Sequence, residues 1–248
     1  MRTVQPILAA IILFLAFLPL QLHAGEKCPA CTEFDTLNTA IRDGGIGKAD
    51  ALKELRRLLP RLKDYYTSSG ALPYPRREWH FPLEGYDLKS SGNSGKDYVA
   101  SGYDYFAGNR HGGHPSFDLF VRDRNQDDLD DRSNRPVNVL SLTGGIVVAL
   151  ATEWDSGSRL RGGKYVWVYD PSEELLVYYA HNRDILVGLG DILKPGDRIA
   201  TVGRTGLNAR KKRSPTHLHL TCLRLGRDGY PRPENIYQNL KSAGRTGN

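Results

Sequence analysis

Apolar residues recur at helical spacing between residues 34 and 66. Phe34, Leu37 and Ile41 would share one face of a helix that ends at Gly44-Gly45. A second run with three- and four-residue spacing follows and comprises Leu52, Leu55, Leu59, Leu62 and Tyr66. Pro60 interrupts this run and is expected to kink or split the second helix. The pattern predicts a helical hairpin packed on the rest of the chain, with partner binding or self-blocking of a site as alternatives.

From about residue 137 onward the pattern changes to short apolar runs without helical periodicity. Gly144-Gly145 separates residues 137–142 from 146–150, and Asp170-Pro171 separates residues 165–169 from 175–180, which predicts two β-hairpins. A third turn, Lys194-Pro195-Gly196-Asp197, lies within residues 192–201. Residues 68–82 read as a linker and residues 85–113 as loops. We therefore expect a mainly β protein, a compact antiparallel β domain with an N-terminal helical hairpin.

The first residues have the pattern of a secretory signal peptide. Arg2 precedes an apolar run over residues 7–20, and His23-Ala24 offers a small residue at a cleavage point. The run is short for a membrane span, which needs about 20 residues, and an uncleaved anchor is the alternative. We expect a signal peptide at 1–24, a helical region with linker at 25–77, the main domain at 78–240 and a tail at 241–248. The protein would then be exported to the periplasm or the cell envelope, with no stable membrane insertion after cleavage.

The charge balance gives a modest indication about partners. The chain has 34 Lys and Arg against 28 Asp and Glu, a formal net charge of +6. A mildly basic exported protein suits a negatively charged envelope polymer. Many ordinary soluble proteins have the same charge balance. Arg210-Lys211-Lys212-Arg213 has no interleaved aromatic residues, so no nucleic acid is expected as a partner. This run is interpreted as a solvated loop, with binding of substrate carboxylates as the alternative.

Three cysteines do not make a disulfide scaffold. Cys28-Pro29-Ala30-Cys31 could form a local disulfide after export or act as a redox pair. A thioredoxin-type role needs a preceding strand, which the sequence does not provide, so a structural bond or a frayed terminus is favoured. Cys222 would be left unpaired.

Histidines gather in and around the predicted strands. His217 and His219 are two apart in an apolar run, so in a strand both rings would face one side of the sheet. His114 and Asp118 open the β region, and His181 ends a predicted strand. A catalytic zinc ion needs three protein ligands of the histidine or aspartate type and one open position for water. The zinc ion lowers the pKa of that water. Two partly exposed strand histidines are the alternative interpretation of the His217 pair.

Several short motifs occur in one order along residues 81–223: His-x-x-x-Asp at 114–118, Tyr-x-His at 179–181, Gly-Asp at 190–191, Pro-Gly-Asp at 195–197, Gly-x-Thr-Gly at 203–206 and His-Leu-His-Leu at 217–220. In this order the motifs resemble those of the lysostaphin-type, LytM-like zinc endopeptidases. The resemblance implies an antiparallel β domain with a narrow groove. It also implies one Zn²⁺ per chain held by His114, Asp118 and His219, with His181 and His217 as the catalytic rings.

In that family the reaction is hydrolysis of peptide bonds in peptidoglycan crosslinks or stem peptides, so peptidoglycan peptides are the expected partner. The alternative is a catalytically inactive relative that regulates or docks other cell-wall hydrolases through a protein partner. Such relatives usually lose zinc ligands, whereas this chain has a candidate at each position.

Two features depart from the family pattern. Family members often have glycine at the position of Ser116, so the local turn is expected to differ. An acidic insert over residues 123–131 begins like a calcium loop, but Asp128 stands where the template has glycine, and Asn134 where it has glutamate. We interpret the insert as a solvated acidic loop, with calcium binding as the alternative.

Overall fold

The N-terminal part of the structure is a helical hairpin. The computed structural model describes residues 27–245, so the predicted signal peptide lies outside the described residues. Helix α1 runs over Pro29–Asp43 and helix α2 over Lys48–Ser68. Gly44 ends α1 in the left-handed conformation, with φ of 76°. Phe34, Leu37 and Ile41 are buried as predicted, and none of the helices within residues 27–245 is long and apolar enough to cross a membrane.

Helix α2 differs in detail from its prediction. It continues without interruption through Pro60, so the expected split was wrong. Pro60 is exposed, and water can therefore satisfy the carbonyl that loses its helical partner. The buried stripe is Ala51, Leu55, Leu58, Leu62 and Tyr66, so it follows Leu58 rather than Leu59.

The start of α1 is fixed by a disulfide between Cys28 and Cys31. Both cysteines are buried, and Cys28 Sγ accepts a hydrogen bond from the Cys31 backbone N–H. Pro29 stands at the first turn, where its missing N–H costs nothing. Cys222 is a buried free thiol. The cysteine pair therefore forms the local disulfide that the sequence offered, and its structural role stays a prediction.

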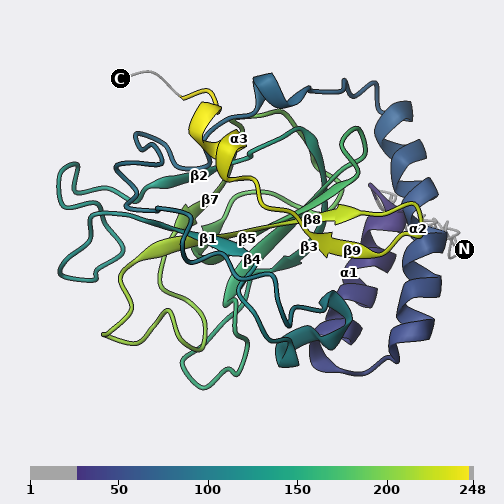
Figure 1. The fold of residues 1–248 in the computed structure, drawn as a ribbon, viewed down its shortest axis with the longest axis horizontal. Helices are drawn as coiled ribbons and strands as arrows, with labels where there is room; N and C mark the ends of the chain where they lie inside the picture. The colour runs from purple at the N-terminus through teal and green to yellow at the C-terminus, as the bar shows by residue number, and fades with distance from the viewer. Residues whose placement is uncertain (1–26, 246–248) are drawn as a thin grey trace, which may run out of the picture.

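The main body is a nine-stranded antiparallel sheet, as counted within residues 27–245, which confirms the predicted fold class (Figure 1). Its central path is β1-β8-β5-β4-β3-β6. The strand bounds are β1 Ser116–Phe120, β2 Asn138–Leu140, β3 Gly145–Ala151, β4 Lys164–Asp170, β5 Leu175–Ile185, β6 Ile192–Leu193, β7 Arg198–Val202, β8 His217–Leu225 and β9 Pro231–Pro233. Three short helices complete the fold: η1 Arg76–Glu78, η2 Tyr105–Arg110 and α3 Tyr237–Ser242.

The predicted hairpins have different outcomes. Strands β4 and β5 form the expected hairpin around Asp170-Pro171. The hairpin predicted around Gly144-Gly145 was wrong, because β2 pairs with β7 and β3 pairs with β4 and β6. The glycines at this position permit close packing, since a Cβ on Gly144 would overlap the Tyr74 ring. The Lys194–Asp197 turn is present, but its flanking strands β6 and β7 pair with other strands.

The two faces of the sheet bury different cores. Alternate residues of β4, β5 and β8, such as Val166, Tyr179 and Leu220, pack on one face beneath α3 and residues 79–88. The intervening residues, such as Trp167, Leu176 and Leu223, pack on the other face against α1 and α2. The histidines of β8 belong by alternation to this second face. The hairpin therefore covers one part of the same surface that carries the histidines.

Candidate metal centre and active site

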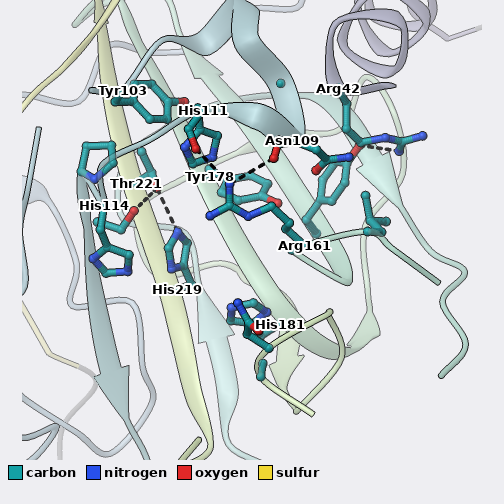
Figure 2. A pocket seen from close by; sticks show the side chains of 18 of the residues that line it. Arg42, Tyr103, Asn109, His111, His114, Arg161, Tyr178, His181, His219 and Thr221 are labelled. Carbon is teal, nitrogen blue, oxygen red and sulfur yellow. Dashed lines mark hydrogen bonds between the residues drawn. The ribbon is translucent and has the colours of Figure 1, made fainter. Parts of the chain in front are cut away.

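Strand register gathers the predicted ligands around His219. In the β1–β8 pair Asp118 lies opposite His219, and in the β5–β8 pair Ala180 lies opposite it on the other side. Ser116, Asp118 and Phe120 of β1 alternate with the buried Phe117 and Leu119, so Asp118 faces the histidine side. His114 lies four residues before Asp118, and its Nε2 contacts the Asp118 carboxylate. Figure 2 shows the His114 and His219 rings side by side in the pocket.

The distances among these three residues fit a tetrahedral zinc ion. Asp118 Oδ1 lies 3.3 Å from His114 Nε2 and 3.0 Å from His219 Nδ1. Two ligands bound at zinc–nitrogen or zinc–oxygen distances lie about 3.3 Å apart at the tetrahedral angle. His181, His217 and His219 form a second possible group, and within each group the donor atoms lie within 4.8 Å of one another. The group with Asp118 also supplies the negative charge that a dication favours.

Electrostatics keeps the central carboxylate ionised. Burial opposes the charge of Asp118, but hydrogen bonds from His114 and His219 hold its pKa well below the usual range. The same contact with Asp118 raises the pKa of His114 to about 8. A metal ion that binds here would have to displace a proton from His114, because only the neutral ring is a ligand.

His181 and His217 both present Nε2 to the pocket, because a backbone carbonyl holds the Nδ1 of each ring. His217 Nδ1 lies 2.7 Å from the Pro215 carbonyl, and His181 Nδ1 lies 2.8 Å from the Thr205 carbonyl. A carbonyl can only accept, so both Nδ1 atoms carry the proton and both Nε2 atoms are free acceptors. Burial lowers the pKa of both rings, that of His181 well below its ordinary value. Both rings are therefore neutral and oriented.

His181 reaches this position through an irregular backbone. Ala180 already faces the hairpin side, so strict alternation would turn His181 to the opposite face. Instead His181 has φ of 68°, in the left-handed region that non-glycine residues rarely adopt, and the β5–β7 register shifts between Asn182 and Asp184. The ring centroids of His181 and His217 are 4.9 Å apart as a result.

The hydroxyls of Thr221 and Ser116 form a hydrogen-bonded chain that contacts the His219 ring. Its Nε2 lies 3.4 Å from Thr221 Oγ1, and this hydroxyl lies 2.6 Å from Ser116 Oγ. With a metal bound, a ring protonated at Nε2 would donate to Thr221 and leave Nδ1, which otherwise donates to Asp118, free as a ligand atom. Ser116, the residue that departs from the family pattern, is thus part of a buried hydrogen-bonded chain across strands β1 and β8.

Residues 127–231 match the model of Peptidase family M23. The match covers less than half of the chain and shows what residues 127–231 are similar to. M23 is a family of peptidases, so the resemblance that the sequence motifs indicated is confirmed. The matched region contains His181, His217 and His219 and begins after Asp118. None of the curated proteins matches this sequence.

Three solved structures are similar at low identity. Lysostaphin from Staphylococcus simulans is 19% identical with a TM-score of 0.41, covering 68% of this chain and 58% of its own. A zinc-containing peptidase from Vibrio cholerae is 18% identical with a TM-score of 0.39, covering 68% and 41%. A Ruminococcus gnavus protein described as a lytM glycyl-glycine endopeptidase is 23% identical with a TM-score of 0.44, covering 88% and 84%. The chain thus spans less than two thirds of the first two structures, and its activity has to be argued from its own residues.

The acidic insert, residues 123–131, is tied by hydrogen bonds to the loop before His217. Asp123 accepts hydrogen bonds from the Asp127 and Asp128 backbone N–H groups and from the Thr216 hydroxyl, the last at 2.6 Å. Arg204, also buried, donates to the same hydroxyl at 3.0 Å. The insert therefore uses this carboxylate to order Thr216, the residue directly before the histidine pair.

The histidines open into a cavity of ≈ 320 Å³, a volume typical of ligand sites. Its aromatic lining is Tyr103, Tyr105, Tyr165, Trp167 and Tyr178. His111 also lines it, and its ring lies 4.8 Å from that of Tyr103. The residues that sequence reasoning missed are Asn38 and Arg42 of helix α1 and Arg161 of a loop (Figure 2). The Arg161-Gly162-Gly163 turn was the available signal for the last of these.

Proposed function

We propose that this chain is an exported zinc-dependent endopeptidase that hydrolyses peptide bonds in peptidoglycan crosslinks or stem peptides. The observation that carries the proposal is the convergence of His114, Asp118 and His219 with two further neutral histidines in one pocket. The match of residues 127–231 to Peptidase family M23 supports peptide hydrolysis. Arg2 and the apolar run over residues 7–20 support export to the periplasm or cell envelope.

The donor set is suited to zinc. His114, Asp118 and His219 provide two nitrogens and one oxygen at separations that a tetrahedral ion accepts. Zinc, when bound, supplies a Lewis acid that polarises a carbonyl and lowers the pKa of water. Thr221 would fix the tautomer and orientation of His219.

The remaining chemistry falls to His181 and His217. Their Nδ1–H groups are held by backbone carbonyls, so each Nε2 can take a proton from an attacking water molecule. A ring that gains this proton can return it to the departing amine. The other ring can hold the tetrahedral oxyanion only when its Nε2 carries a proton. One histidine can therefore act as the base, while its neutral neighbour, which has no proton on Nε2, can accept a hydrogen bond from the same water molecule.

The test combines metal analysis with digestion of the natural polymer. The protein without residues 1–24 is expected to hold about one zinc ion and to release new peptide ends from purified sacculi, identified by mass spectrometry. Absence of zinc after gentle purification and zinc repletion, together with intact sacculi, would favour the inactive regulator.

A further inference from the structure

The wall of the pocket carries Arg161, which forms no ion pair with any of the residues that the structure describes. Arg161 lines the cavity and is half-buried. Its Nη1 donates to the carbonyls of Asn109 and His111, each at 3.1 Å (Figure 2). Within residues 27–245 no carboxylate lies within ion-pair distance of it, and no acceptor contacts its Nε or Nη2. The Nη1 group of the guanidinium is thus anchored. The Nε–Nη2 edge, which can donate two parallel hydrogen bonds to one carboxylate, is left free.

The second arginine of the pocket is different. Arg42 donates to both carboxylate oxygens of Asp43, at 2.8 and 2.7 Å, and to the Tyr165 hydroxyl at 3.1 Å. Its charge is already matched inside the protein. Among the described residues that line the cavity, the only acidic one is Asp118, which belongs to the metal group. The free positive charge of the cavity wall is therefore that of Arg161.

Close packing holds Arg161 next to the catalytic histidines. The Gly162 carbonyl accepts a hydrogen bond from the His181 backbone N–H at 2.8 Å. A Cβ on Gly162 would overlap the Tyr178 hydroxyl, so this turn can lie against the aromatic wall only with glycine. A Cβ on Gly206 would lie 2.9 Å from His181 Nδ1 and would also strike the Arg161 carbonyl. The turn that carries Arg161 and the ring of His181 are thus one packed unit.

We propose that Arg161 binds a carboxylate of the peptide substrate, so that the enzyme prefers peptides with a carboxylate close to the scissile bond. This inference rests on the proposed function, because it assigns a specificity residue to that site. An anchored guanidinium with a free Nε–Nη2 edge has the chemistry for this ligand, and the one acidic residue that lines the pocket within residues 27–245, Asp118, is engaged in the metal group. The carboxylate can come from a free C-terminus or from an acidic side chain near the cleaved bond.

The experiment uses three crosslinked peptides with the same scissile bond. One has a free C-terminus and neutral side chains, one has an amidated C-terminus and an acidic side chain, and one is neutral at both places. Wild type, Arg161→Met and Arg161→Lys are compared, with Arg159→Met as the matched control, because Arg159 is an exposed cation of the same loop outside the cavity. Zinc content and melting temperature establish that each variant is folded.

Wild type and Arg159→Met should cleave one carboxylate peptide with kcat/KM about 10- to 100-fold above the neutral peptide, the scale of a charged hydrogen bond. Arg161→Met should lose this preference, so that its kcat/KM values for the carboxylate and neutral peptides become equal whatever its absolute rate, and Arg161→Lys should retain part of it. The preferred peptide identifies the source of the carboxylate. A preference that persists in Arg161→Met, or equal rates for wild type on all three peptides, overturns the inference.

Direct binding separates this failure from failure of the proposed function. If wild type cleaves none of the peptides, the proposed function fails and the same three peptides are titrated calorimetrically into the zinc-loaded protein. Tighter binding of a carboxylate peptide that disappears in Arg161→Met would still support Arg161 as its site. Equal binding of the three peptides would reject it.

Discussion

Strand β8 serves two purposes on a single face. Towards its end, Leu223 and Leu225 are buried in the core that the helical hairpin completes. Towards its start, His217, His219 and Thr221 occupy the same face by the same alternation, but here they line a cavity. The pleat is identical in the two regions, and the difference lies in what covers them. Apolar positions are sealed by α1 and α2, whereas the polar positions are left open for a ligand.

The largest difference between the two regions should appear when His219 is removed. It belongs to both possible metal groups, so His219→Ala should lose zinc and activity together, to the level of a metal-free control. Zinc content and turnover are measured on the same purified sample. Full zinc occupancy in a folded His219→Ala protein would place the metal elsewhere.

His217→Ala and His181→Ala should separate catalysis from metal binding. Each leaves His114, Asp118 and His219 in place, so zinc should remain while kcat falls by about 10²- to 10⁴-fold, the scale of a positioned acid–base group. His114→Ala is the contrasting variant and should lose the metal. The opposite pattern, with zinc lost from His217→Ala and His181→Ala but kept in His114→Ala, would assign the ion to the three-histidine group.

A substitution in the core that helices α1 and α2 cover should lower the stability of the fold and leave zinc binding intact. Leu58 is buried in the hairpin core, so Leu58→Ala should lower the free energy of unfolding by about 2–5 kcal/mol. The folded protein should still bind zinc, because neither metal group includes a hairpin residue. Leu72→Ala is the control, since Leu72 is 65% exposed and should change stability little. Denaturant unfolding measures both variants, and equal effects would contradict the description of the hairpin as core.

The smallest effect is expected at the boundary between the regions. Thr221→Val removes the hydroxyl beside His219 Nε2 and should weaken zinc affinity by about 10- to 100-fold while the fold persists. Thr143→Val is the matched control, because Thr143 is equally buried but does not line the cavity. Competition with a zinc chelator gives both affinities. Unchanged affinity in Thr221→Val would reduce this hydroxyl to a packing role.

Local patterns predicted the elements well, and long-range pairing was the main source of error. The helices and the β4–β5 hairpin depend on neighbours in sequence, which periodicity and turn residues report. The pairing of β2 with β7 depends on segments some sixty residues apart, so two glycines between β2 and β3 were taken for a hairpin turn. Chain order alone could not show this partner.

The candidate site was predictable to a similar degree. Spacing placed His217 and His219 on one face, and family resemblance named His114, Asp118 and His181. Their separation into ligands and catalytic rings stays a prediction. Arg161 and Asn38 were missed because a loop and a distant helix bring them to the cavity, and the glycine turn after Arg161 indicates a loop without showing where that loop lies.

The backbone of His181 has a consequence for protein engineering. A designer who copied the five side chains onto a regular antiparallel sheet would obtain an incomplete constellation, because an ordinary strand at that register points the His181 ring towards the opposite core. The left-handed residue and the register shift after it would have to be transplanted as well, together with the Thr205 carbonyl that holds the ring. The transferable unit is therefore a deformed strand with its supporting loop.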